Sequence, residues 1–250
     1  MENAFSKLTL EASLARKLES LKETEAAWFG GSRATGTEDR LSDTDLVVIS
    51  AQPEVVFEKI ENLLKENFTI EKSWTVETSL WKCSQKFYIL KETPETYFVD
   101  ISVFSSLDPQ DYREFFNVER HGRAEILFDR RGILREAAQA PRYEKPLPVT
   151  DASTLGRIEV LYRTFLKEAQ REKYIDSMAF FQRLLAVWIQ TLRRAYAPQK
   201  HDFGLRYATL DLPPTESEKI EKYLKVHDLE TMKSYAQEIR NSILTISQEN

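Results

Sequence analysis

The sequence predicts an α+β fold in which a sheet with flanking helices is followed by an α-helical bundle. Apolar residues alternate in short runs in the first half of the chain, as they do in strands with one buried face, and later recur at the helical period of about 3.6 residues. The pattern changes after residues 140–150, where three prolines interrupt both helices and strand ladders. We therefore expect a first domain over residues 1–140, a linker over 141–150 and a helical domain over 151–250.

The composition is typical of a globular protein with one or two domains. The chain has 250 residues, of which 42% are hydrophobic, enough to bury real cores. Its formal net charge of −5 argues against a dedicated nucleic-acid binder, so a nucleic-acid partner is not expected. Cys83 is the single cysteine, which excludes an internal disulfide and fits a reducing compartment.

Nothing in the sequence predicts a membrane segment. Residues 1–25 lack the apolar core of a signal peptide, and no stretch approaches the roughly 18 apolar residues of a membrane-spanning helix. We therefore expect a cytoplasmic protein without a membrane partner, while the composition leaves its oligomeric state open.

The first domain is predicted to begin with an amphipathic helix, because apolar residues recur at helical spacing from Phe5 to Leu21. Pro53 is suited to the first position of a second helix, which ends near Asn67. Apolar alternation predicts the strands, which are Glu25–Phe29, a run through Leu46 to Ile49, Phe68–Glu77, Lys86–Lys91, Tyr97–Phe104 and Glu125–Phe128.

The second domain is predicted to be a small antiparallel bundle. Its helices carry apolar residues on one face, and their expected ranges are Ala152–Glu168, Ser177–Tyr196, Glu216–Val226 and Leu229–Ser247.

The stretch from Trp28 to Ser50 carries the chemistry. Gly30 and Gly31 lack a Cβ atom, so the backbone can turn sharply and approach a ligand closely. This leaves backbone N–H groups and the Ser32 hydroxyl available for phosphate oxygens. The stretch therefore predicts a phosphate-binding loop.

Two aspartates follow this loop and lead into an apolar strand. Asp43 and Asp45 are two residues apart, so their side chains lie on the same face of a strand, roughly 7 Å apart at Cα. Mg²⁺ takes one or two carboxylates and completes its coordination with water and substrate phosphates. The pair therefore predicts a magnesium site beside the phosphate-binding loop.

The order apolar-Gly-Gly-Ser, polar loop, Ser-Asp-x-Asp-Leu and apolar strand resembles the nucleotidyltransferase superfamily, which includes DNA polymerase β and the aminoglycoside adenylyltransferases. The resemblance implies a polymerase β-like domain with a mixed sheet, a nucleoside triphosphate as co-substrate, by default ATP, and a catalytic carboxylate triad that binds Mg²⁺. The residues it assigns to nucleotide binding are Gly30, Gly31, Ser32, Arg33 and Ser42.

Asp100 is the candidate for the third carboxylate. It interrupts the apolar strand Tyr97–Phe104, where a lone buried charge is costly, so it is expected at the rim, neutralised or bound to a cation. The resemblance makes it the third metal ligand, and Glu77 ranks second. The general base stays open between Asp100 and a bundle carboxylate, Glu159 or Glu168.

A second resemblance lies in the helical domain. Pro198-x-Lys200-x-Asp202, the pair Tyr207-Ala208 and then Leu212-Pro213 are similar to the helical domain of the streptomycin and spectinomycin type of adenylyltransferase. That resemblance implies that Lys200 reaches the nucleotide phosphates, and an ammonium there would offset the charge of departing pyrophosphate.

Together these features predict an enzyme that transfers a nucleoside monophosphate, by default AMP from ATP, to a hydroxyl of a small molecule, with an aminoglycoside-like antibiotic as one acceptor class. Two alternatives remain at this stage. The first is a nucleotidyltransferase that acts on a protein or an RNA end, and the second is a nucleotide-binding relative without catalysis.

Overall fold

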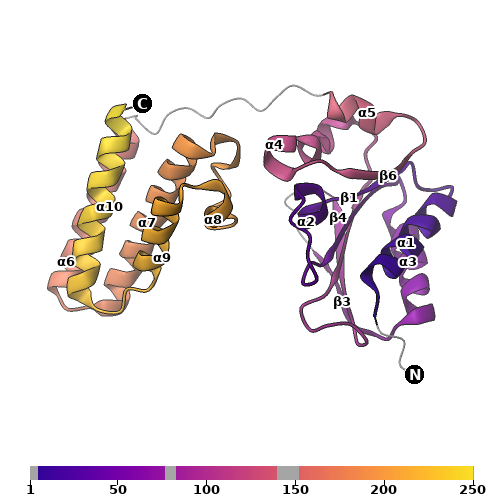
Figure 1. Ribbon diagram of the computed structural model, residues 1–250, viewed down its shortest axis with the longest axis horizontal. Coiled ribbons are helices and arrows are strands. Elements are labelled where there is room, and N and C mark those ends of the chain that lie inside the picture. Colours follow the sequence, from indigo (N-terminus) through magenta and orange to yellow (C-terminus); the bar gives the residue numbers. More distant parts are fainter. Residues whose placement is uncertain (1–4, 77–82, 140–151, 250) are drawn as a thin grey trace. The chain divides into compact units, whose positions relative to one another are not determined.

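The computed structural model describes residues 5–76, 83–139 and 152–249. The chain divides into two compact units, residues 1–142 and 143–250, and each is described by itself (Figure 1). The first unit contains a mixed sheet with flanking helices, and the second is helical. The predicted α+β fold is therefore confirmed.

Six strands of the described residues form one sheet in the order β3-β4-β5-β2-β1-β6. Among the neighbouring strands described, β2 and β5 run parallel and the other pairs are antiparallel. Because β2 and β5 are parallel and in register, both strands begin at the same edge of the sheet. The bounds are β1 Ala26–Phe29, β2 Thr44–Ile49, β3 Ile70–Val76, β4 Ser84–Leu90, β5 Val99–Phe104 and β6 Glu125–Asp129.

Helices α1 (Lys7–Ser20) and α3 (Pro53–Asn67) lie next to each other on one face of the sheet (Figure 1). The Ser6 side chain caps α1 by accepting a hydrogen bond from the Thr9 N–H at 3.3 Å, and Pro53 occupies the first turn of α3. Leucines of α1 pack there against Leu46 and Val48 of β2. This core fixes which face of β2 is buried under the helices.

The opposite face of the sheet has its own apolar cluster. It includes Val47 and Ile49 of β2, and Trp28 of β1 packs there against Tyr112 and Phe116. Because side chains alternate along a strand, Asp45 projects from this second face. The elements that precede and follow β6 in the chain are η1 Pro109–Asp111, η2 Arg113–Phe116, α4 Val118–His121 and α5 Ile133–Ala138.

Three short α-helices among the described residues of the first unit were not predicted, and they are α2 (Gly31–Thr35), α4 and α5. The polar loop after the glycine pair begins with the one-turn helix α2, and α5 follows β6. Helix α5 forms because the Asp129 carboxylate accepts hydrogen bonds from the N–H groups of Ile133 and Leu134, both at 3.0 Å. Asp129 lies four residues before the first residue of α5, so the spacing of apolar residues in the sequence does not indicate that it caps a helix.

The second unit packs α7 against both α6 and α10 around an apolar core that includes Phe165, Trp188 and Ile239. Arg193 is buried and donates hydrogen bonds to the carbonyl oxygen of Gly204 and to Asp211. No helix in the described ranges is long and apolar enough to span a membrane. The bounds are α6 Ala152–Gln170, α7 Tyr174–Tyr196, η3 Pro198–Lys200, α8 Ala208–Asp211, α9 Pro214–Leu224 and α10 Leu229–Glu249.

Candidate active site

Two of the predicted carboxylates lie side by side at the edge where β2 and β5 begin. Asp45 is the register partner of Asp100 in the parallel ladder. Neighbouring strands are about 4.8 Å apart, and paired residues project from the same face, so the two side chains are neighbours. Both residues are half-buried, which keeps their carboxylates accessible to a ligand.

The surroundings of Asp100 show that a third carboxylate is near. Gln85 of β4 donates hydrogen bonds from Nε2 to both carboxylate oxygens of Asp100, at 3.0 and 2.9 Å. Burial raises the pKa of Asp100 to about 6; the hydrogen bonds from Gln85 oppose the rise, and the negative charge of Asp43 adds to it. Carboxylates that raise one another's pKa are stabilised by a cation placed between them.

The glycine loop is packed directly against Asp45. The Gly30 N–H donates to the carbonyl oxygen of Asp45 at 3.0 Å, which joins the loop to β2. Gly31 has a φ of +54°, and a Cβ atom built on it would lie 1.6 Å from Oδ2 of Asp45. A side chain at Gly31 would therefore displace the carboxylate, and only glycine fits both the backbone angle and the space.

Of the other predicted nucleotide-binding residues of the first unit, Gly30 begins a helix, while Arg33 and Ser42 have side-chain partners of their own. Gly30 is the N-cap of α2, and the first N–H groups of a helix have no partner within the helix. The Arg33 guanidinium lies 2.6 Å from Glu11 and 3.2 Å from Glu38. Ser42 closes a turn by hydrogen bonding to Asp39.

A buried polar network supports this region from the other face of the sheet. Thr44, between the two aspartates in sequence, donates to Glu11 at 2.9 Å and shares a hydrogen bond with Tyr97 at 2.7 Å. Glu11 also accepts from Arg33, so one carboxylate joins α1, α2 and β2. Burial raises the pKa of both Glu11 and Tyr97.

Residues 12–107 match the family model of the nucleotidyltransferase domain.

The matched range extends from α1 past the end of β5, so it includes the glycine loop and all three aspartates. The match supports the predicted superfamily and nucleotidyl transfer as the general activity. The search of curated proteins gave no match. The likeness to the aminoglycoside adenylyltransferases stays a prediction.

Nucleotidyltransferase domains generally use divalent metal ions. In the described part of the chain, no three His, Cys, Asp or Glu side chains are gathered tightly enough to hold a metal ion by themselves. The paired Asp45 and Asp100 nevertheless provide the one or two carboxylates that Mg²⁺ takes from protein when phosphates and water complete its coordination. The donor set therefore fits Mg²⁺ together with a nucleotide.

The remaining candidates of the sequence lie in the second unit or outside the described residues. Lys200 lies in η3, with its Nζ atom 2.6 Å from Asp211. Glu159 accepts a hydrogen bond from Arg240, and Glu168 accepts one from Arg171. Glu77, the second choice for the third carboxylate, is outside the described residues, as is the predicted linker over 141–150.

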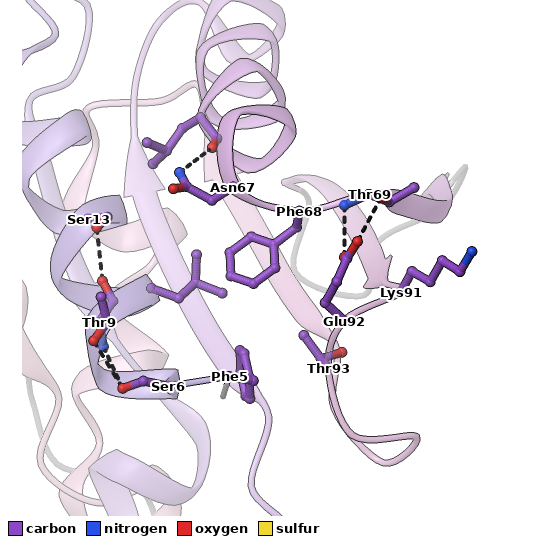
Figure 2. Close-up of a pocket in the computed structure, with 12 residues that line it drawn as sticks. Phe5, Ser6, Thr9, Ser13, Asn67, Phe68, Thr69, Lys91, Glu92 and Thr93 are labelled. Carbon is purple, nitrogen blue, oxygen red and sulfur yellow. Dashed lines mark hydrogen bonds between the residues drawn. The ribbon is translucent and has the colours of Figure 1, made fainter. Parts of the chain in front are cut away.

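A cavity of about 1080 Å³ lies elsewhere in the first unit (Figure 2). Phe5 and Thr9 line it from the side of α1, Phe68 lines it just after α3, and Lys91 to Thr93 line it from the turn after β4. Its apolar wall includes Leu10, which belongs to the core under α1 and α3. The cavity is therefore on the face of the sheet opposite to Asp45 and is not the candidate active site.

The sequence alone did not single out Gln85, Glu11 or Thr44. Gln85 is one polar residue in an alternating strand, and it becomes important only because β4 pairs with β5 in this register. Glu11 resembles the other charged residues of an amphipathic helix. A signal was present for Thr44, since its position between two aspartates requires its side chain to face the core.

Proposed function

We propose that the chain transfers a nucleoside monophosphate, in the first place AMP from ATP, to a hydroxyl group of a small molecule and releases pyrophosphate. The observation that carries this proposal is the contact of Gly31 with the carboxylate of Asp45, which is in turn paired with Asp100. A loop suited to phosphate and a pair of carboxylates thereby share one edge of the sheet. Residues 1–140 would form the catalytic domain and residues 151–250 a helical domain joined by the linker 141–150.

In this proposal, Asp43, Asp45 and Asp100 would hold Mg²⁺, which when bound supplies positive charge that offsets the charge of the triphosphate. The loop residues Gly30, Gly31 and Ser32 would hold phosphate oxygens through backbone N–H groups and the Ser32 hydroxyl.

The reaction forms one bond and breaks one. The acceptor oxygen attacks the α-phosphorus, the bond from this phosphorus to the bridging oxygen breaks, and pyrophosphate leaves with the electron pair. The hydroxyl proton goes to a general base. Asp100 is suited to that role because it lies beside Asp45 in the parallel ladder and Gln85 orients both of its carboxylate oxygens. Glu159 and Glu168 remain alternatives for the base.

Lys200, Arg33 and Ser42 are proposed as further contacts to the nucleotide. Lys200 would exchange its contact with Asp211 for phosphate oxygens, and Asp211 would keep its ion pair with Arg193 at 3.0 Å. The acceptor is proposed to be a small molecule of the aminoglycoside kind, and the enzyme to work in the cytoplasm.

The experiment that tests the proposal follows the position of the label in ATP. The protein is incubated with Mg²⁺ and a panel of hydroxylated acceptors, including aminoglycosides, with ATP labelled on either the α- or the γ-phosphate. We expect α-label on one acceptor and γ-label in pyrophosphate, with both signals lost in Asp45→Asn. The appearance of γ-label on an acceptor, or release of free AMP whatever the acceptor, would contradict the proposal.

A further inference from the structure

A continuous row of paired residues crosses four strands of the sheet. Trp74 of β3 pairs with Phe87 of β4, Phe87 pairs with Asp100 of β5, and Asp100 pairs with Asp45 of β2. Directly paired residues project from the same face of a sheet. The two aromatic side chains and the two carboxylates therefore lie on one face, in a line perpendicular to the strands.

The two aromatic rings of this row form a stacked pair. The ring centroids of Trp74 and Phe87 are 5.3 Å apart, with an angle of 21° between the ring planes, and Phe98 packs against Phe87 at 5.9 Å. Trp74 is 47% exposed, although tryptophan is among the side chains that gain most from burial. Exposed aromatic surface beside polar groups is a feature of ligand-binding sites.

The glycine loop and the aromatic pair lie on opposite sides of the two carboxylates. Strand β1 and the glycine loop that follows it lie on one side of β2, while β5, β4 and β3 lie on the other. The carboxylates are therefore between Gly31 and the aromatic pair. If the triphosphate lies on the glycine loop, as the proposed function requires, the aromatic side is left for the acceptor.

We propose that Trp74 and Phe87 form the acceptor subsite, and that the acceptor is a molecule of two or more linked rings. Asp100 and Trp74 are two strands apart, which corresponds to about 10 Å, a span that one six-membered ring does not cover. The ring that carries the reacting hydroxyl lies beside Asp100, and the distal ring stacks on Trp74. This inference rests on the proposed function for the position of the nucleotide.

The first test measures ring binding directly, without catalysis. The protein is labelled with 5-fluorotryptophan, and the ¹⁹F resonance of Trp74 is assigned from its loss in Trp74→Phe, while buried Trp188 serves as an internal reference. The probes are kanamycin A, maltotriose and quercetin, which have linked rings, and 2-deoxystreptamine, glucose and phenol, which have one. They are added to the protein with Mg²⁺ and α,β-methylene-ATP, an ATP analogue whose α–β bridge does not break, so no transfer takes place.

We expect at least one linked-ring probe to shift the Trp74 resonance, and to bind at least tenfold more tightly than its single-ring counterpart. The probe that succeeds distinguishes an amino-sugar, a neutral saccharide and an aromatic ring system. No shift of Trp74 with any linked-ring probe, or equal binding of single rings, would overturn the proposal.

The second test uses variants with the probe that binds. Trp74→Ala should weaken its binding about 10- to 100-fold, the usual effect of removing one stacking partner, and Trp74→Phe should restore most of it. The matched control is Ile126→Ala, because Ile126 is also 47% exposed and lies on β6, the other edge strand of the sheet. Equal effects of Trp74→Ala and Ile126→Ala would overturn the proposal.

The stabilisation of the protein by Mg²⁺ and ATP separates this proposal from the proposed function. It depends on the glycine loop and the carboxylates, so Trp74→Ala should leave it unchanged. Normal stabilisation without any ring-dependent shift of Trp74 would refute the acceptor subsite alone. Absence of stabilisation in the wild type would refute the proposed function, and the Trp74 resonance would still decide whether rings bind.

Discussion

The contact between Gly31 and Asp45 gives the sharpest prediction for a single substitution. In Gly31→Ala, the new Cβ atom would lie 1.6 Å from Oδ2 and 2.5 Å from Cγ of Asp45, whereas ordinary van der Waals contact begins at 3.4 Å. The carboxylate therefore has to move by more than 1 Å, because the backbone of Gly31 is fixed as the first residue of α2, two residues after the end of β1.

The expected losses of stability and of activity in Gly31→Ala have two separate causes. An alanine in the left-handed backbone conformation costs roughly 1–2 kcal/mol of folding free energy. A misplacement of about 1 Å in a reacting geometry can lower the rate about 100-fold. We therefore expect Gly31→Ala to lose at least 100-fold in nucleotidyl transfer, with a fall in melting temperature of only about 2–8 °C.

Gly36→Ala is the matched control for this experiment. Gly36 also has a positive φ, +72°, but a Cβ atom there would meet nothing within 4 Å. Gly36→Ala therefore places an alanine in the same unfavourable backbone conformation but causes no collision. This variant should lose a similar amount of stability and keep most of its activity. Transfer assays and thermal unfolding on both variants separate the two costs. If Gly31→Ala is no less active than Gly36→Ala, the reasoning is refuted.

Three further predictions concern Gln85, Glu11 and Lys200. Gln85→Ala removes two hydrogen bonds to Asp100, so kcat should fall about tenfold or more while KM for ATP changes little; an unchanged kcat would contradict a positioning role. Burial raises the pKa of Glu11, so the wild type loses stability as the pH rises through that value, whereas Glu11→Gln does not. The melting temperature of the variant relative to the wild type should therefore increase as the pH rises above about 4.3, the ordinary pKa of a glutamate, and a constant difference would contradict this. Lys200→Met should raise KM for ATP about tenfold, and an unchanged KM would leave Lys200 as a structural partner of Asp211.

Most of the fold could be predicted because it depends on the regular spacing of apolar residues within short stretches of the sequence. The strands and long helices of both units follow from alternation or helical spacing, and the glycine loop and Asp43 and Asp45 are contiguous in sequence. The short helices α2 and α5 escaped prediction because they depend on a positive φ at Gly31 and on a cap from Asp129.

The site was harder to predict than the fold because it depends on strand register. Trp74, Phe87 and Asp100 each lay in a predicted strand, but nothing in the local sequence indicates that they face one another across the sheet. Glu11 escaped prediction for a similar reason, since its partners Arg33 and Thr44 are 22 and 33 residues away. Such contacts are determined by tertiary packing.

In the proposed function, Asp45 and its neighbours bind a nucleoside triphosphate together with Mg²⁺. The most direct measurement is thermal unfolding of the wild type and Asp45→Asn with Mg²⁺ and, separately, ATP, GTP, CTP and UTP. A ligand at about 100 times its dissociation constant adds roughly 2.7 kcal/mol, which corresponds to an increase of about 5–11 °C in melting temperature. We expect this increase for at least one nucleotide, only with Mg²⁺ and only in the wild type. No increase with any nucleotide, or an equal increase in Asp45→Asn, would contradict it.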